Sequence, residues 1–342
     1  MADIFATLDE ILADRLLVLD GAMGSMLQRH KLDEAAFRGH LLSGHGCDVQ
    51  GDSDLLVLTQ PKIVQSVHRD YLLAGADIIE TNTFGATRIA QADYQLEHLA
   101  YEMNLRGAEI AREVADEVAR SSGKPRFVAG SIGPTNRTLS ISPKVSDPAF
   151  RAVTWQQMLD SYGEQARGLL DGGADLLLVE TIFDTLNAKA CLYAISEELE
   201  RRGQRVPVMV SVTITDRSGR TLSGQTLEAF WTSIRHSNPW SVGINCALGA
   251  REMRPLVEEL AGLATSRISC YPNAGLPNAF GGYDEEPGTT GALLAEFAQQ
   301  RWVDVVGGCC GTTPEHIAAI GDAVSPLKPR GVHAWVGYKQ AA

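Results

Sequence analysis

Short apolar runs recur along the 342-residue chain, each separated from the next by a segment of helical length. Several runs are almost continuously apolar, which is typical of parallel strands that are covered on both faces. Residues 62–73 and 97–120, which lie between such runs, show the spacing of amphipathic helices. The apolar runs predict eight strands, at residues 16–20, 76–81, 127–131, 175–181, 208–214, 241–245, 268–271 and 303–307.

The alternation of strands and helices predicts an α/β fold. Eight repeats at a spacing of roughly 40 residues favour a closed (β/α)₈ TIM barrel over a doubly wound sheet. We expect one barrel domain over residues 16–330, with a helical extension at 1–15 and a tail at 331–342. Long loops rich in Gly, Pro, Asn and Thr follow two of the strands, at 130–148 and 271–288. Loops in these positions form the active-site rim of a TIM barrel.

Composition and charge narrow the class of function. The 44% of hydrophobic residues supports a large buried core and excludes a disordered chain. The net charge of −12 argues against a broad surface for nucleic acid. No apolar run approaches the roughly 18–20 residues of a membrane span, and the first residues lack the basic-then-apolar order of a signal peptide. We therefore expect a cytoplasmic protein whose six cysteines are reduced.

Three of the cysteines stand where predicted strands end. Cys246 closes the sixth strand, and Cys309 and Cys310 follow the eighth. Neighbouring residues of a regular strand point to opposite faces, but the glycines that flank the pair allow the backbone to bend and both sulfurs to converge. Three thiolates would fill three corners of a Zn²⁺ tetrahedron and leave the fourth open, as catalytic zinc sites do. The alternative is that they are small buried hydrophobes; the glycines and the third cysteine favour zinc. For Cys47, Cys191 and Cys270 we expect packing or incidental exposure instead of ligation.

Two carboxylates also stand at strand ends, Asp20 after the first strand and Glu180 after the fourth. A carboxylate in an apolar setting is costly unless a cation or hydrogen-bond donor meets it. Asp20 could cap a helix and Glu180 could pair with an Arg or Lys, but two carboxylates at separate strand ends favour a pocket for a substrate ammonium group. Gly21 either leaves room for a ligand beside Asp20 or makes a tight turn.

Polar residues of two further strand ends are candidates for substrate binding. Asn245 precedes Cys246 and could contact a substrate carboxylate or brace its loop. Thr81, Asn82 and Thr83 follow the second strand and offer hydroxyl, amide and backbone groups, either to the substrate or to the cap of a helix.

Seven motifs, in chain order, resemble those of the homocysteine S-methyltransferases: LDGAMGSMLQ, ETNTFGAT, GSIGPTNRTLSISP, VETIFDTLNAK, GINCALG, YPNAGLPN and GGCCGTTPEHI. The resemblance runs from about residue 10 to 325 and is closest to the N-terminal homocysteine-binding module of cobalamin-dependent methionine synthase. GINC together with GGCCG is the most specific part. DLLVLTQP at 54–61 and SISP at 140–143 fit this module better than the betaine-dependent members.

The resemblance implies that Cys246, Cys309 and Cys310 bind zinc and that Asp20 and Glu180 hold the homocysteine amino group. It places Asn245 and residues 81–83 around the substrate. The activity that it implies is homocysteine S-methyltransfer to form methionine, in which Zn²⁺ deprotonates and positions the homocysteine sulfur for attack on an electrophilic methyl group.

The resemblance leaves the methyl donor open. Methionine synthase continues into folate and cobalamin modules that this sequence does not contain, so we expect methylcobalamin only through a separate partner protein of a split enzyme. A stand-alone enzyme that uses betaine or S-methylmethionine is an alternative. Onium donors favour an aromatic cage, and the 6% of aromatic residues supplies only Phe84 and Tyr283 as rim candidates. A non-catalytic subunit that binds zinc or homocysteine is the third possibility.

Overall fold

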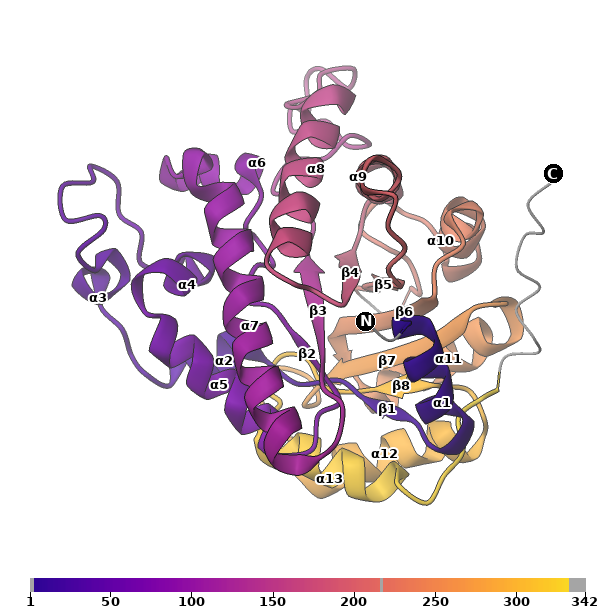
Figure 1. Cartoon of the computed structure of the whole chain (residues 1–342). Helices are drawn as coiled ribbons and strands as arrows, with labels where there is room; N and C mark the ends of the chain where they lie inside the picture. Colours follow the sequence, from indigo (N-terminus) through magenta and orange to yellow (C-terminus); the bar gives the residue numbers. More distant parts are fainter. Residues whose placement is uncertain (1–2, 216–217, 332–342) are drawn as a thin grey trace.

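The computed structural model describes residues 3–215 and 218–331, and all but the first residue of the predicted tail at 331–342 lies outside this part. It contains an eight-stranded parallel sheet in the order β1-β8-β7-β6-β5-β4-β3-β2 (Figure 1). The strands are β1 Leu17–Val18, β2 Ile78–Glu80, β3 Phe127–Ile132, β4 Leu176–Ile182, β5 Val208–Val212, β6 Ser241–Gly249, β7 Arg267–Asn273 and β8 Val305–Val306.

The two ends of this order, β1 and β2, also meet. Leu19 and Ile78 form a parallel bridge, and the Asp20 N–H donates to the Ile78 carbonyl at 3.0 Å. Just before this bridge, the Asp77 N–H donates to the Val18 carbonyl at 2.7 Å. The sheet therefore closes into a barrel, which confirms the predicted (β/α)₈ fold.

Helices alternate with the strands around the outside of the barrel (Figure 1). Their ends follow local signals: Thr154 and Gln157 form a capping box at the start of α8, and Gly123 ends α7 in a left-handed conformation. The helices are α1 Ile4–Asp14, α2 Met23–Gln28, α3 Glu34–Arg38, α4 Leu56–Thr59, α5 Pro61–Leu73, α6 Arg88–Gln91, α7 Ala100–Ser122, α8 Trp155–Asp171, α9 Thr185–Arg202, α10 Leu227–Ile234, α11 Ala250–Leu263, α12 Pro287–Gln299 and α13 Pro314–Val324. Short 3₁₀ turns are η1 Ser53–Leu55, η2 Ala92–Tyr94, η3 Glu97–Leu99 and η4 Arg235–Ser237.

Alternate residues of each strand belong to two different buried clusters. The outer cluster packs the sheet against the surrounding helices. The inner cluster fills the barrel with side chains such as Leu19, Ile78 and Leu178. Leu8 and Leu12 of α1 join this inner cluster, so the N-terminal helix expected in residues 1–15 packs against the interior of the barrel. The inner apolar layer ends below the carboxyl ends of the strands, where the inward side chains become polar.

Strand β6 differs from its prediction. It continues to Gly249 and does not stop at Asn245, and its pairing with β7 shifts between Asn245 and Gly249. Cys246 and Ala247 lie in this irregularity with φ of 59° and 60°. Cys246 is therefore inside a distorted strand and does not close a regular one. In the described part of the chain, no helix has the length and apolar character required to cross a bilayer.

Candidate active site and metal centre

Cys246, Cys309 and Cys310 come together at the carboxyl end of the barrel, as the sequence predicted. Their sulfur atoms all lie within 4.8 Å of one another, and the Cys246 and Cys310 sulfurs are 3.7 Å apart. Tetrahedral ligands at the Zn–S distance of about 2.3 Å are about 3.8 Å apart, so this spacing fits a shared metal ion. All three side chains are partly exposed, and the cluster is therefore open to solvent on one side.

Backbone irregularity, as the flanking glycines predicted, brings the sulfurs together. Cys246 has a left-handed backbone conformation, so its side chain does not follow the alternation of a regular strand. No glycine next to Cys246 in the sequence indicates this conformation. After β8, the Cys309 N–H donates to the Pro272 carbonyl at 2.8 Å, and the Cys310 carbonyl accepts from the Ala274 N–H at 2.9 Å. Gly311 follows with φ of 80°, and a Cβ there would lie only 2.4 Å from Tyr283.

The thiols and one tyrosine interact electrostatically. Hydrogen bonds from Cys246 and Cys309 lower the pKa of Cys310 to about 3. Hydrogen bonding to Cys246 and Cys310 raises the pKa of Cys309 well above its usual range. Burial and the charge of Cys310 raise the pKa of Tyr283 to about 12, which places this rim aromatic beside the cluster.

The other three cysteines lie apart from this cluster. Cys191 and Cys270 are buried in the outer apolar core, where burial raises their pKa values. Cys47 is partly exposed, and its thiol donates to the Asp48 carbonyl at 3.5 Å. In the described residues the only group of three metal-binding side chains of the Cys, His, Asp and Glu type is the Cys246 cluster.

Three carboxylates, and not the two predicted, converge at the same end of the barrel. Asp20 Oδ2 accepts from the Glu80 N–H at 3.0 Å, and the carboxyl groups of Glu80 and Glu180 hydrogen-bond to each other. Asp20 Oδ1 and Glu80 Oε1 are buried without a hydrogen-bond partner in the described structure. None of the ion pairs within residues 3–215 and 218–331 involves any of the three.

The carboxylates are therefore held in an environment that disfavours their charge. Burial raises the pKa of Asp20 well above its usual range, and it does the same for Glu80 together with the charge of Glu180. Burial raises the pKa of Glu180 to about 7, although Ser131 Oγ donates to Glu180 Oε1 at 2.5 Å. The charge of Cys310 also raises this pKa, so the carboxylates and the thiols are neighbours. A bound cation would stabilise the ionised carboxylates.

Glu80 and Ser131 were not predicted, although the sequence contains a signal for them. Each stands two residues after an inward apolar side chain, Ile78 in β2 and Ala129 in β3. Because side chains in a strand alternate, both must point into the barrel. Following this alternation through the predicted strands would have placed both of them at the site.

Asn245 is completely buried and braces three strands. Its Oδ1 accepts from Ser211 Oγ at 2.7 Å and from the Thr181 N–H at 3.1 Å, while its Nδ2 donates to Thr181 Oγ1 at 2.8 Å. Thr181 has a φ of 56°, an uncommon conformation for a β-branched residue, and these bonds help to hold it. The contacts correspond to the bracing alternative; contact of Asn245 with substrate stays a prediction.

The polar residues after β2 are buried and mutually bonded. The hydroxyls of Thr81 and Thr83 are 2.6 Å apart, and each also bonds to the backbone of Ser131. Asn82 Nδ2 donates to the Ser53 carbonyl at 2.7 Å. The cap of the next helix, α6, is Thr87, so capping is not the role of Thr81, Asn82 or Thr83. Their contact with substrate is untested by these bonds.

Gly21 lies directly after Asp20, against protein on one side. A Cβ at this position would be 2.7 Å from Thr312 Oγ1 and 2.9 Å from the Tyr71 ring. The packing of Tyr71 from α5 and of Thr312 from the loop that carries the cysteines therefore requires a residue without a side chain here. The backbone of Gly21 remains a candidate for substrate contact.

The fold and the site define a TIM-barrel protein with a cluster of three thiols beside three unpaired carboxylates. A family model for homocysteine S-methyltransferase matches residues 17–324, so the chain belongs to the homocysteine S-methyltransferase family and is a methyltransferase with homocysteine as substrate. The resemblance noted in the sequence is confirmed.

Solved structures of one protein support the fold. The metallated form of the homocysteine methyltransferase MmuM from Escherichia coli is 24% identical, with a TM-score of 0.70 over 92% of this chain and 99% of that one. The oxidized form of the same protein gives the same values. The apo form is 22% identical, with a TM-score of 0.64 over 94% of this chain and 100% of that one.

Proposed function

We propose that this chain is a zinc-dependent homocysteine S-methyltransferase that forms methionine, and that its methyl donor is methylcobalamin carried by a separate protein. The observation that carries the zinc assignment is the approach of three cysteine sulfurs to within 4.8 Å at an accessible barrel end. A metallated form is known for the structurally similar MmuM. When bound, Zn²⁺ would supply Lewis acidity that keeps the substrate thiol deprotonated and nucleophilic.

Different residues of the chain then bind different groups of the substrate. Cys246, Cys309 and Cys310 would hold the metal ion, which would also bind the homocysteine sulfur. Asp20 and Glu180, whose pKa values are raised chiefly by burial, bind the ammonium group. An arriving ammonium group lowers these pKa values and favours the ionised pair.

Further residues fix the position of this substrate. We propose that the backbone of Gly21 and the segment Thr81, Asn82 and Thr83 contact it, and that Asn245 acts chiefly by holding the strand ends. Fixing the sulfur and the ammonium at separate points orients the substrate for in-line attack on a methyl group.

The preference for methylcobalamin rests on the aromatic residues of the rim. Phe84 is 42% exposed, while Tyr283 packs on Gly311 beside the thiols. Rings that pack on two different loops, Phe84 beside Gly133 and Tyr283 beside Gly311, are a poor cage for the cation of betaine or S-methylmethionine. Cobalamin carried by a partner protein needs an open rim, and the cysteines are partly exposed.

The test is methyl transfer to homocysteine by zinc-loaded protein, with methylcobalamin, betaine and S-methylmethionine compared as donors. We expect methionine from methylcobalamin at the highest rate; a far higher rate with betaine would reverse the donor assignment. Cys309→Ala should lose both zinc and turnover, and Cys47→Ala, a matched cysteine outside the cluster, should keep both. Turnover that persists in zinc-free Cys309→Ala would exclude the proposal.

A further inference from the structure

A second pair of carboxylates, one buried and one partly buried, lies outside the candidate active site, beside the loop that follows β2. Asp52 and Asp54 flank the first residue of η1, and both line an open cavity of about 240 Å³. The opposite wall consists of Gly85 from the loop after β2, Gln91 of α6 and Tyr94 of η2. Asp52 is 2% exposed and Gln91 is 1% exposed.

Two oxygen atoms of this cavity have no hydrogen-bond donor among the described residues, Asp52 Oδ2 and Gln91 Oε1. The orientation of the Gln91 amide is determined by its partners, because Nε2 donates to Asp52 Oδ1 at 3.1 Å and to the Gly85 carbonyl at 3.3 Å. Both partners accept only, so reversing the amide would place oxygen against oxygen. Gln91 Oε1 therefore stays without a donor, although such buried groups are normally satisfied.

Asp54 adds a second negative charge at the same place. Its Oδ1 accepts from the Gly85 N–H at 3.0 Å, and a Cβ on Gly85 would lie 2.7 Å from Asp54 Oδ2. Burial raises the pKa of Asp52 to about 6, and burial with the charge of Asp52 raises the pKa of Asp54 to about 8. The ionised pair is thus unfavourable without a cation.

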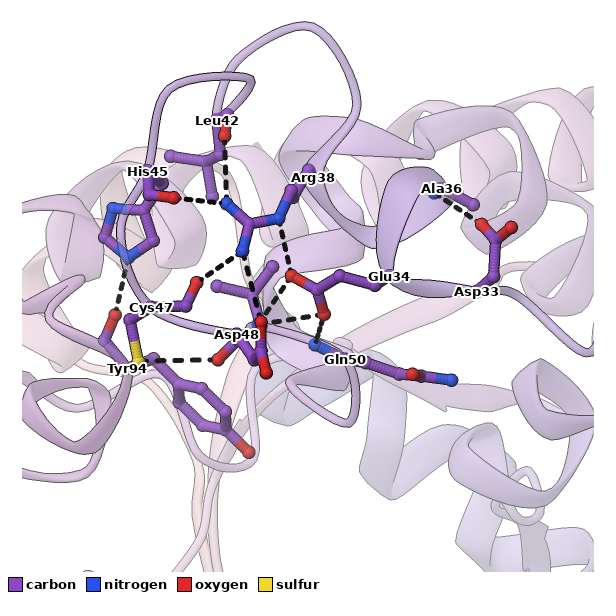
Figure 2. A network of polar contacts seen from close by, with 11 residues as sticks. Asp33, Glu34, Ala36, Arg38, Leu42, His45, Cys47, Asp48, Gln50 and Tyr94 are labelled. Carbon is purple, nitrogen blue, oxygen red and sulfur yellow. Dashed lines mark hydrogen bonds and ion pairs between the residues drawn. The ribbon is translucent and has the colours of Figure 1, made fainter.

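Two arginines near this cavity, Arg38 and Arg137, bind other partners. Figure 2 shows the guanidinium of Arg38, the last residue of α3, bonded to Glu34 at 2.6 Å and to the carbonyls of His45 and Cys47 at 2.5 and 2.8 Å. Arg137 pairs with Asp93 at 3.1 Å. Of the Lys and Arg side chains in the described ranges, none forms an ion pair with Asp52 or Asp54.

We propose that this cavity binds a hard divalent cation, with Asp52, Asp54 and Gln91 as oxygen ligands and water completing the shell. Carboxylate and amide oxygens suit Ca²⁺ and Mg²⁺, and an irregular set of ligands suits Ca²⁺ better because Mg²⁺ requires near-octahedral geometry. The cation would join the turn at Ser53 to the loop after β2, which already meet through Asn82. It would thereby stiffen the segment that follows β2 at the substrate end of the barrel.

Terbium(III) is a suitable probe, because it takes oxygen ligands like Ca²⁺ and is sensitised by a nearby tyrosine such as Tyr94. The full chain is first loaded with zinc, so that the cysteines are occupied, and terbium emission is followed on excitation of tyrosine. We expect saturation at one equivalent and displacement by Ca²⁺ at lower concentration than by Mg²⁺. The double variant Asp52→Asn, Asp54→Asn should lower the emission at least tenfold.

Asp48→Asn is the matched control, since the Asp48 side chain is 94% exposed on the adjoining loop, and it should leave emission unchanged. Circular dichroism establishes that each variant is folded. Should the double variant be unfolded, Asp52→Asn alone, which keeps the Asp54–Gly85 hydrogen bond, must weaken terbium binding at least tenfold. Absence of sensitised emission in the wild type, emission retained in the variants, or failure of excess Ca²⁺ to displace terbium would overturn the proposal.

Discussion

Carboxylates lie at both ends of the barrel, but the two sets have different partners. Asp77, Asp175 and Asp304 precede β2, β4 and β8 at the amino end. Asp77 pairs with Arg15 at 2.6 Å, and Asp175 pairs with Arg112 at 2.5 Å. Each also accepts a backbone N–H from the neighbouring strand, at 2.8 to 3.0 Å. These carboxylates join strands to one another and to the surrounding arginines.

At the carboxyl end, Asp20, Glu80 and Glu180 have the same kind of position and no arginine or lysine pair within the described chain. Their hydrogen-bond partners include one another, Ser131, Tyr271 and the Glu80 N–H. Arginine side chains thus pair with Asp77 and Asp175 at the amino end, and no described Lys or Arg side chain pairs with Asp20, Glu80 or Glu180 at the carboxyl end. In TIM barrels generally, the carboxyl ends of the strands carry the active site, and residues at the amino ends contribute to stability.

The largest effect is expected from replacing a carboxylate at the carboxyl end. Asp20→Asn or Glu180→Gln should lower kcat/KM for homocysteine by about a thousandfold, about 4 kcal/mol, because a buried charge partner of the ammonium group is lost. Steady-state kinetics with zinc-loaded protein measures this. 4-Mercaptobutanoate, which lacks the amino group, is the control: its kcat/KM should hardly change. An equal loss for both thiols would contradict ammonium binding by these residues.

The corresponding change at the amino end should affect stability and not activity. Asp77→Ala leaves Arg126 buried without its carboxylate, together with the half-exposed Arg15 and the Val18 N–H. We expect the free energy of unfolding to fall by about 3 kcal/mol, as for other broken buried ion pairs, with kcat/KM unchanged in the folded protein. Urea unfolding and kinetics on the same sample test this. A large loss of kcat/KM at full folding would erase the distinction between the two ends.

The pH dependence of stability distinguishes the two ends further. Folding raises the pKa of Glu180 from 4.5 to about 7, so between these values the folded protein binds more protons than the unfolded chain. The free energy of unfolding therefore falls as pH rises through this range. Glu180→Gln removes the titration and should be more stable than the wild type by on the order of 2 kcal/mol at about pH 8.

This advantage should diminish as the pH falls toward 4.5. Urea unfolding at several pH values, with zinc content matched, measures it. Asp77→Ala is the opposite control, because it should be less stable than the wild type throughout the same range. If Glu180→Gln were less stable at every pH, Glu180 would be a structural residue like Asp77.

The sequence was sufficient to predict the eight strands, because their apolar runs are buried on both faces. It also identified Cys246, Cys309 and Cys310 as a cluster, since the glycines before and after the pair indicate a bend. It did not reveal the left-handed Cys246, because a non-glycine residue takes that conformation only under tertiary constraint.

Contacts between distant segments account for the rest. Glu80 lies inside a predicted strand, and only the three-dimensional structure shows that its carboxyl group contacts that of Glu180. The Asp52–Gln91 contact joins residues 39 positions apart, the residue before η1 and the last residue of α6, and no local pattern indicates that these segments meet. Loops follow tertiary packing more than local propensity, so sequence analysis predicted the strand ends better than the contacts between loops.

The smallest expected effect concerns Ser131, whose hydroxyl donates to Glu180 at 2.5 Å and lowers the pKa of that carboxyl group against the effect of burial. Ser131→Ala should raise this pKa and move the acidic limb of the kcat/KM profile for homocysteine upward by about one pH unit. At pH 7 more of Glu180 is then protonated, so kcat/KM falls several-fold, and at high pH it recovers. Ser211→Ala is the matched control, because Ser211 bonds to Asn245 and should leave the midpoint unchanged. A uniform loss at all pH values would mean that Ser131 acts through packing and not through the charge of Glu180.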